Sequence, residues 1–327
     1  MRLQQLEYIC EVVHQGLKVS GAAEIMQNAQ SGVSTQIRLL EAELNVQIFT
    51  RNGKRLVGIT EAGKLILIKA EQILHSVNDI RRISEEFHNT DKGMLAIATT
   101  HTQARYALPT TIKAFSKKYP EVQLCIHQGN PTQISEMAAM GEVDFAIATE
   151  AITTFQELVM LPCYRWNRCV VVPKGHELCT KGLLTLETLA QYPIITYDFA
   201  FGGRSLINKA FREKGLQPNV VLTAIDSDII KTYVELGLGV GLLARMAFDP
   251  RRDSGLVGID ASHLFEHNIT HIGIRRGKYI RAFMYEFIHL FVPHLTQEVV
   301  DKAMESPVPL HFDVIEYPHV DYSHFAT

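Results

Sequence analysis

The sequence lacks the features that mark membrane-spanning, secreted and metal-binding proteins. No apolar run approaches the roughly 20 residues needed to cross a bilayer, and the first residues, Met1–Gln5, do not resemble a signal peptide. The five cysteines are widely scattered and form no C-x-x-C pair, which argues against a disulfide framework or a zinc site. We therefore expect a cytoplasmic protein with reduced thiols, no bound metal and no membrane contact.

The motifs of common catalytic sites are missing as well. The chain has 14 histidines, but neither a Ser-His-Asp order nor a G-x-S-x-G elbow. His101 is the one histidine expected in a strand-end loop beside hydroxyl and amide donors. The glycines of residues 237–241 lie between an expected helix and an expected strand, the reverse of the order that a dinucleotide phosphate loop requires. The sequence therefore gives little support to an enzyme.

Near its start the sequence predicts three amphipathic helices. Ser20 is placed to cap the second of them. The apolar residues recur at helical spacing: Leu3, Leu6, Ile9 and Val13; then Val19, Ala22, Ala23 and Met26; then Val33, Ile37, Leu40 and Leu44. Three such helices can share one small core, with the last two joined by a tight turn as a helix-turn-helix.

The third helix keeps a polar face that this core leaves exposed. Its hydroxyl, amide and guanidinium groups are those that bind base edges and phosphates from a helix in the major groove: Gln30, Ser31, Ser34, Thr35, Gln36 and Arg38. Residues 49–56 then place an Asn-Gly turn among Arg51, Lys54 and Arg55, which predicts a basic wing against the phosphate backbone. The alternative is a solvated hairpin beside a polar helix face, and the helix pair followed by a wing favours DNA.

Charge sets a condition on this interpretation. The whole chain has a formal net charge of −3, and residues 1–60 carry six basic against five acidic side chains. Such a small excess cannot supply strong non-specific affinity for DNA. Binding would need a local basic face and more than one copy of the domain, so the DNA interpretation requires dimerisation.

Residues 60–88 predict a long helix that meets this requirement. An apolar seam follows alternating steps of four and three residues: Ile66, Ala70, Ile73, Val77, Ile80, Ser84 and Phe87. We expect Ile66, Ile73, Val77 and Ile80 to pair with a second copy of the chain. The alternative is a helix packed on its own chain.

From Gly93 onward, expected strands alternate with expected helices. Strands at 94–99, 122–127 and 144–148, with helices at 103–119 and 132–140, predict half of a doubly wound α/β domain. A second half follows, with strands at 169–173, 193–197, 220–222 and 239–243 and a helix near 205–214. Hydroxyl and amide donors at 99–103, 129–132 and Thr149 follow the first three strands, where such sheets bind small anions. The alternative is helix capping by Thr and Asn.

Longer stretches of the sequence resemble a known family. Residues 30–34, 38–41 and 60–63, with Leu44, Phe49 and Arg51, resemble the LysR-type transcriptional regulators. Residues 97–106, 144–150, 166–168 and 230–234 resemble the CysB branch of that family in particular. The resemblance covers about residues 1–300.

The resemblance implies a domain order. It gives a winged helix-turn-helix at 1–60, a linker and dimerisation helix at 61–90, and a periplasmic-binding-protein-like effector domain at 91–300. The effector domain would have two subdomains, the first at about 91–162 and 265–300 and the second at about 163–264. Residues 301–327 match nothing, and we expect a weakly ordered C-terminal tail.

The resemblance also implies a function. It indicates a homotetrameric activator of sulfur-assimilation and cysteine-biosynthesis genes that binds double-stranded promoter DNA, contacts RNA polymerase and needs no cofactor. The expected inducer is N-acetylserine or O-acetylserine, with sulfate, thiosulfate or sulfide as anion ligands. Thr100, Thr102, Gln103 and Thr149 match the family's ligand-binding residues, and Trp166 lies nearby on the pocket wall.

Two positions depart from the family pattern. Gly202 stands where the family usually has a Thr in the effector pocket, which leaves the identity of the effector open. Ala29 stands where a Ser is common ahead of the third helix, which removes one possible contact to DNA.

Two other functions remain open from the sequence. The chain could be the sister regulator of sulfonate or sulfate-ester use, which shares these motifs and responds to a sulfated nucleotide precursor. It could also be a two-lobed solute-binding module, although the first 60 residues and the missing signal peptide argue against that.

Overall fold

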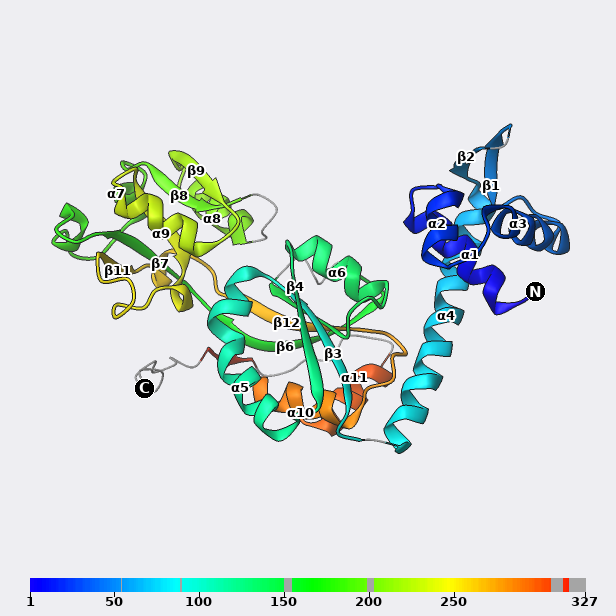
Figure 1. The fold of residues 1–327 in the computed structure, drawn as a ribbon. Coiled ribbons are helices and arrows are strands. Elements are labelled where there is room, and N and C mark those ends of the chain that lie inside the picture. The colour runs from blue at the N-terminus through cyan, green and yellow to red at the C-terminus, as the bar shows by residue number, and fades with distance from the viewer. Residues whose placement is uncertain (54, 89, 150–154, 199–202, 307–313, 318–327) are drawn as a thin grey trace. The chain divides into compact units, whose positions relative to one another are not determined.

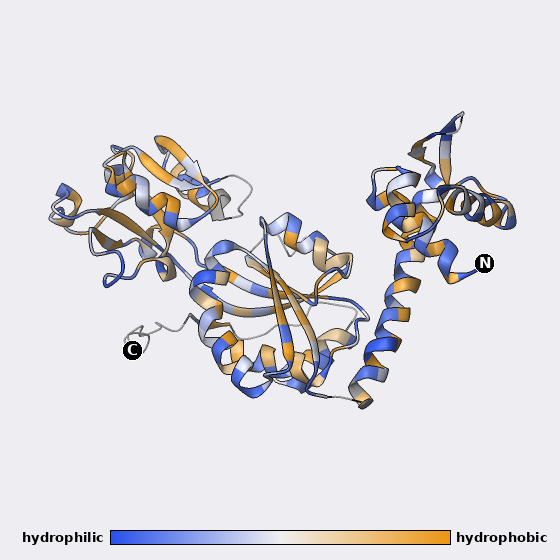
Figure 2. Cartoon of the chain, viewed as in Figure 1, coloured by the Kyte–Doolittle hydropathy of each residue, from blue (hydrophilic) through white to orange (hydrophobic). Residues whose placement is uncertain are grey.

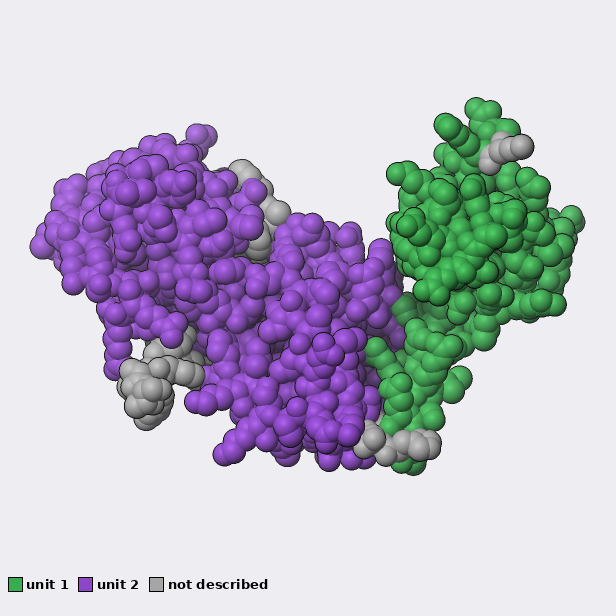
Figure 3. Space-filling model, viewed as in Figure 1, with its two compact units in different colours: residues 1–88 green, residues 89–327 purple. Residues whose placement is uncertain are grey.

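The computed structural model describes residues 1–53, 55–88, 90–149, 155–198, 203–306 and 314–317. Lys54 and Gly202 lie outside the described residues. The chain divides into two compact units, residues 1–88 and 89–327 (Figure 3), and each is described by itself below. None of the described helices combines the length and apolar character needed to span a membrane.

Unit 1 contains the expected helix-turn-helix, wing and long helix. Its elements are α1 (Leu3–His14), α2 (Val19–Ile25), α3 (Gln30–Leu44), β1 (Phe49–Asn52), β2 (Arg55–Ile59) and α4 (Glu61–His88). Leu6, Ile9, Val33 and Leu40 meet in one buried core. The expected cap of α2 is wrong, because the helix begins one residue before Ser20 and its N-cap residue, Lys18, makes no side-chain capping bond.

The wing and the long helix are joined by a close backbone approach. A Cβ atom at Gly63 would lie 2.1 Å from the carbonyl oxygen of Ile48, so only glycine fits there. The hydroxyl of Thr60 accepts a hydrogen bond from the Gly63 amide at 2.8 Å and donates to the Gln47 carbonyl at 2.6 Å. These contacts fix the start of α4 against the wing.

Unit 2 contains two lobes, each built on its own sheet (Figure 1). Lobe I has a six-stranded sheet in the order β13-β6-β12-β5-β3-β4. Its strands are β3 (Gly93–Thr99), β4 (Val122–Gln128), β5 (Phe145–Thr149), β6 (Leu158–Trp166), β12 (Asn268–Arg275) and β13 (Ile315–Glu316). Its helices are η1 (Gln103–Ala107, a π-helix), α5 (Leu108–Lys118), α6 (Pro131–Ala139), α10 (Ala282–Phe291) and α11 (Gln297–Glu305).

Lobe II has a five-stranded sheet in the order β11-β7-β10-β8-β9. Its strands are β7 (Arg168–Pro173), β8 (Ile194–Tyr197), β9 (Val220–Ala224), β10 (Val240–Ala244) and β11 (Leu256–Asp260). Its helices are η3 (Glu177–Cys179), α7 (Leu186–Leu189), α8 (Gly203–Glu213), α9 (Ser227–Glu235), η4 (Arg245–Ala247) and η5 (Ser262–Leu264). Figure 2 shows mainly hydrophobic colour on the central strands and alternating colour along α4.

In each lobe three strands run parallel, as the alternating pattern predicts. β3 pairs in parallel with β4 and β5, and β8 does so with β9 and β10. The glycine-rich segment at 237–241 connects α9 to β10, so it runs from helix to strand. A Cβ atom at Gly239 would lie 2.4 Å from the Pro193 carbonyl oxygen, so this glycine serves close strand packing.

The chain crosses between the lobes twice. β6 pairs with β12 as far as Trp166, and β7 begins in the other sheet at Arg168. The first crossing therefore falls at Asn167 rather than near the expected residue 163, because β6 continues that far. The chain returns between Asp260, the end of β11, and Asn268, the start of β12.

The C-terminal region departs from expectation. The sequence predicts a weakly ordered tail from residue 301, and for the residues described there this prediction is wrong. Helix α11 continues to Glu305, and Ile315–Glu316 form β13. β13 pairs in parallel with β6. Pairing between distant segments leaves no local periodic signal, so the sequence pattern did not predict it.

A buried ion pair supports lobe I, and its loss tests that role. Lys278 Nζ lies 2.7 Å from an Asp144 carboxylate oxygen, both side chains are about 98% buried or more, and Asp144 also accepts the Ala96 amide at 2.8 Å. We expect Lys278→Ala to lower the free energy of unfolding by about 3–5 kcal/mol, because a buried carboxylate loses its cation. Urea unfolding followed by the fluorescence of Trp166, the single tryptophan, measures this loss.

The matched control is Lys118→Ala, which removes an exposed lysine from its pair with the half-buried Glu286 and should cost less than about 1 kcal/mol. Equal losses in the two variants would show that the buried pair has no special role.

His271 on β12 gives lobe I a defined response to acid. Burial lowers the pKa of its imidazole from 6.5 to about 4, although a hydrogen bond with the Ile269 backbone opposes the shift. The unfolded chain then takes up a proton before the folded one does. Stability should fall as the pH drops from 6.5 to 4, by at most about 3 kcal/mol.

The variant His271→Gln should flatten this part of the stability curve, measured by urea unfolding at a series of pH values. His289→Gln, at an exposed position on α10, should leave it unchanged. If the stability of His271→Gln still falls between pH 6.5 and 4 as steeply as that of the wild type, other groups cause the acid response.

Candidate functional site

The polar face of α3 lies on the surface of unit 1, as expected. Gln30, Ser31, Thr35 and Arg38 are exposed and Ser34 is half-buried. The Thr35 hydroxyl donates to the Ser31 carbonyl at 2.8 Å, which leaves its oxygen able to accept. The first turn of α3 therefore presents short polar groups, the arrangement by which a recognition helix contacts base edges.

The wing brings its basic residues to different environments. Gly53 adopts a positive φ of 61° at the expected turn, and Arg55 is exposed on β2. Arg51 instead lies against α3, where one guanidinium nitrogen is 2.7 Å from Glu41 Oε2 and another donates to it at 2.8 Å. Its side chain is only 23% exposed, so much of Arg51 is directed at the protein.

Glu41 is the buried centre of this contact. It is 2% exposed and accepts the Ile48 and Phe49 amides at 2.9 and 3.1 Å as well as the Arg51 guanidinium. The carboxylate thus fixes the angle between α3 and the wing through charge-assisted bonds. The sequence reasoning missed this role, because a Glu on a helix usually faces water.

The seam of α4 is divided between the core and the surface. Ile66 packs against the helix-turn-helix core and Val77 is half-buried, whereas Ile73 and Ile80 are 38% and 66% exposed. Phe87, further along the same seam, is 86% exposed. An exposed apolar stripe of this length is typical of a surface that binds a partner.

In unit 2 a cavity of about 360 Å³ lies between the lobes. Its walls follow the carboxyl ends of four parallel strands, with His101 after β3, Gln128–Asn130 at the end of β4, Asp198 after β8 and Ile225 after β9. This is where open α/β sheets bind ligands. None of the five described candidate effector residues lines this cavity, although Thr100 and Thr102 flank His101 in sequence.

Gln103, Trp166 and Thr149 are brought together by Thr270, a fully buried residue of β12. The Thr270 hydroxyl oxygen accepts Gln103 Nε2 at 3.1 Å and Trp166 Nε1 at 3.0 Å, and Thr149 is its register partner on β5. Tyr164 donates its hydroxyl to Gln103 Oε1. Both ends of the Gln103 amide are therefore held by the protein.

Thr102 connects the two lobes. Its hydroxyl lies 3.4 Å from that of Ser227, which in turn lies 2.7 Å from the Tyr197 hydroxyl. Thr100 opens the turn that leads into η1, since its carbonyl accepts the Ala104 amide. Asn130, expected among the anion donors, instead caps α6 by accepting the Gln133 amide at 2.9 Å, so the capping alternative holds there.

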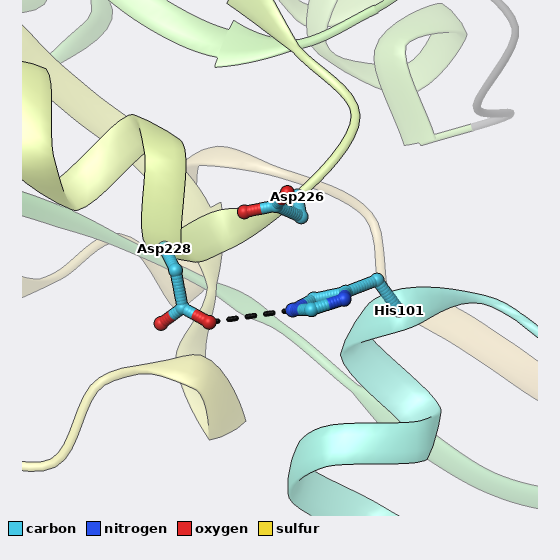
Figure 4. A group of neighbouring side chains, drawn as sticks. All are labelled: His101, Asp226 and Asp228. Atoms are coloured by element: carbon cyan, nitrogen blue, oxygen red, sulfur yellow. Dashed lines mark hydrogen bonds and ion pairs between the residues drawn. The ribbon is translucent and has the colours of Figure 1, made fainter. Parts of the chain in front are cut away.

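His101, Asp226 and Asp228 form a group whose ligand atoms lie within 4.8 Å of one another (Figure 4). Asp228 is already surrounded by donors from both lobes. Arg105 Nε lies 2.7 Å from it, Lys231 Nζ 3.2 Å and His101 Nε2 3.3 Å, and the Tyr106 hydroxyl donates to it at 2.7 Å. Because two cations already neutralise this carboxylate, we interpret the group as an ion network between the lobes.

Electrostatics agree with that interpretation. Burial raises the pKa of Asp228, but hydrogen bonds from Tyr106 and His101 and the charge of Lys231 outweigh it, so the pKa is lowered. Burial lowers the pKa of Lys231, but bonds to Tyr106 and Asp253 outweigh it and the pKa is raised. Both groups therefore stay charged at neutral pH.

A larger cavity of about 440 Å³ lies beside the first crossing. Trp166 lines it together with Arg165, Arg168 and Tyr317. Arg168 is 1% exposed, donates to Asn268 Oδ1 at 2.9 Å and stacks 5.6 Å from the Trp166 ring centroid. Trp166 thus contacts both the Thr270 hydroxyl and the wall of this cavity.

Comparison with known proteins decides the family. A family model described as a bacterial regulatory helix-turn-helix protein of the lysR family matches residues 3–64, and one described as the LysR substrate binding domain matches residues 88–296. The chain belongs to the LysR family of transcriptional regulators. The expectation of a winged helix-turn-helix regulator with a two-lobed effector domain, rather than an enzyme, is therefore confirmed.

Relatives of this LysR regulator agree with the CysB branch. The chain is 50% identical over 308 residues to the transcriptional regulator SsuR of Burkholderia cenocepacia, covering 94% of this chain and all of that protein. It is 50% identical over 303 residues to CysB of Haemophilus influenzae, covering 93% of this chain and 94% of that one. The crystal structure of the cofactor-binding domain of the Cbl regulator is 44% identical, with a TM-score of 0.63, and covers 66% of this chain and 95% of its own.

Arg51 and Arg55, two of the three basic residues of the wing, make a test of this LysR regulator's DNA-binding domain. We expect Arg51→Ala to speed amide hydrogen exchange at Ile48 and Phe49 and to weaken DNA binding, because the buried Glu41 loses its cation. Arg55→Ala should leave exchange unchanged, weaken binding to all DNA sequences alike and lower the slope of log affinity against log salt by about one.

Exchange by mass spectrometry and binding by fluorescence anisotropy give the two measurements. Arg51→Ala could instead leave amide hydrogen exchange at the wild-type rate and lower the slope of log affinity against log salt as Arg55→Ala does. This result would show that Arg51 acts only as a phosphate contact.

Proposed function

We propose that the protein is a ligand-responsive regulator of sulfate-assimilation and cysteine-biosynthesis genes, with N-acetylserine or O-acetylserine as inducer. The observation that carries the proposal is the cavity at the carboxyl ends of β3, β4, β8 and β9, which is lined by His101, the residue between Thr100 and Thr102 in the sequence. Hydroxyl and amide donors suit a small, already charged solute. Similarity to CysB along nearly the whole chain supports the same class of genes.

The site residues follow from this proposal. Thr100, Thr102, Gln103 and Thr149 bind the inducer or an anion such as sulfate, thiosulfate or sulfide, and Trp166 responds through Thr270. Gly202 occupies a position where the family usually places a hydroxyl, and its effect on ligand preference belongs to the same proposal.

The proposed assembly follows from unit 1 and the exposed seam. Residues 1–60 bind promoter DNA, residues 61–90 pair two chains through Ile66, Ile73, Val77 and Ile80, and residues 91–300 bind the effector. Two dimers form a homotetramer in the cytoplasm, and the complex contacts RNA polymerase. Exposed Ile73 and Ile80 support this pairing.

We infer that the effector acts through the relative orientation of the two lobes. A ligand that binds one orientation more tightly shifts the population toward it. The spacing of four DNA-binding domains on the promoter then changes and alters the bend of the DNA. The ion network around Asp228 is the contact that such a change would rearrange.

A second regulator of the same branch is the main alternative. Relatives named SsuR and CysB share this chain at the same 50% identity, so overall similarity does not separate a cysteine regulator from a regulator of sulfonate or sulfate-ester use. The effector separates them, because the latter would respond to a sulfated nucleotide precursor.

Fluorescence anisotropy of the full-length protein tests the proposal. A fragment of a sulfate-assimilation promoter is compared with a scrambled fragment of equal length, with and without N-acetylserine or O-acetylserine. We expect selective binding that shifts with the ligand. Thr100→Val should weaken the ligand response about tenfold, the cost of one hydrogen bond to a charged group, and keep DNA selectivity.

The control is Thr223→Val, an equivalent change at an exposed position of β9. Selective binding that ignores both acetylserines would contradict this inducer and favour the sister regulator. Equal binding to both fragments would contradict the proposed gene class.

A further inference from the structure

The C-terminal strand β13 is attached to the edge of the lobe I sheet. Ile315 and Glu316 pair in parallel with Tyr164 and Arg165 of β6, and the Tyr317 amide donates to the Arg165 carbonyl at 2.9 Å. Glu316 forms an ion pair with Arg165. A segment far along the chain is therefore bound to the strand that carries Tyr164.

Tyr317, the residue after β13, contacts both β6 and η1. Its ring packs on the Tyr164 ring with centroids 4.7 Å apart, and its hydroxyl donates to the Tyr106 carbonyl at 3.2 Å. Tyr106 belongs to the π-helix η1, a rare conformation that is frequent at functional sites. Tyr317 thus joins β6 to the helix that begins with Gln103.

Tyr164 connects Tyr317 to Gln103. It is 2% exposed and donates its hydroxyl to Gln103 Oε1, while Gln103 Nε2 donates to Thr270. Burial raises the pKa of Tyr164 well above its ordinary value, so the hydroxyl keeps its proton and remains a donor. The amide of Gln103 can therefore take only one orientation while Tyr164 stays in place.

We propose that Tyr317 is a positioning residue of the effector site, which holds Tyr164 and thereby the amide of Gln103 when β13 is docked. The inference rests on the proposed function, in which Gln103 binds the effector. Docking of β13 then prepares the amide for ligand and removes part of the ordering cost of binding. By reciprocity, effector binding makes β13 harder to detach by the same factor.

Trp166 gives a direct optical readout of this network. It is the single tryptophan of the chain, and its indole donates to the same Thr270 oxygen as Gln103. The full-length protein is titrated with sulfate and, separately, with N-acetylserine and O-acetylserine while Trp166 emission is recorded. The variants are Tyr317→Ala and Tyr317→Phe, with Tyr192→Ala as control.

We expect Tyr317→Ala to weaken ligand binding at least about fivefold, the lower end of usual couplings between sites. Tyr317→Phe keeps the ring on Tyr164 and should have a smaller effect. Tyr192→Ala removes a tyrosine of lobe II whose hydroxyl donates to Glu177, and it should bind ligand as the wild type does. In the wild type, bound ligand should slow hydrogen exchange at the Tyr317 amide. The factor of this slowing should equal the factor by which Tyr317→Ala weakens ligand binding.

The outcomes separate this inference from the proposed function. Equal ligand affinities in the wild type and Tyr317→Ala would overturn the inference and leave the function standing. The wild type could respond to none of these ligands, while the substitution Tyr317→Ala still shifts the Trp166 emission of the ligand-free protein. This result would contradict the proposed effector but support the contact from Tyr317 through Tyr164 to Gln103. Unchanged emission in the ligand-free variant would overturn that contact as well.

Discussion

The passage of the chain between two sheets is the constraint on which the rest of unit 2 depends. Because the chain crosses at Asn167 and returns before Asn268, parallel strands of both lobes end at the same cavity. Carboxyl ends of parallel strands offer free amide groups and helix N-termini, which favour a small anion without any catalytic group. The pairing of β6 with β12 also brings Trp166 and Thr270 together close to these crossings.

Contacts between the lobes combine buried apolar side chains with a polar network, and the polar network affects how the lobes can move. Asp228 of lobe II is bound by three residues of η1 and its preceding turn, and Lys231 contacts both Tyr106 and Asp253. Such bonds have defined lengths and angles, so they favour a few discrete arrangements over continuous sliding. A ligand at the cavity could select one of these arrangements by bonding to the same turn.

Local sequence patterns predicted the helices and strands. They could not predict contacts between residues that lie far apart in the sequence. The apolar run at 94–99 and the Asn-Gly turn at 52–53 gave β3 and the wing because both signals lie within a few residues. The bond from Gln103 to Thr270 spans 167 positions, and Arg51 meets a buried Glu41 that resembles any surface glutamate in sequence. Neither contact has a periodic signature, and the same holds for Tyr317 on Tyr164. Family resemblance supplied Gln103 and Trp166 as candidates, whereas only the fold supplied the residues that hold them.

The central claim is that occupancy of the cleft in unit 2 is transmitted to DNA. Energy transfer between dyes at the two ends of a promoter fragment, with the full-length protein bound, measures the bend of that DNA directly. The account predicts that saturating acetylserine changes the transfer efficiency, and that Thr100→Val requires about tenfold more ligand for the same change. The account would be contradicted if the energy-transfer efficiency stays constant while the emission of Trp166 shows that the cavity is saturated with ligand.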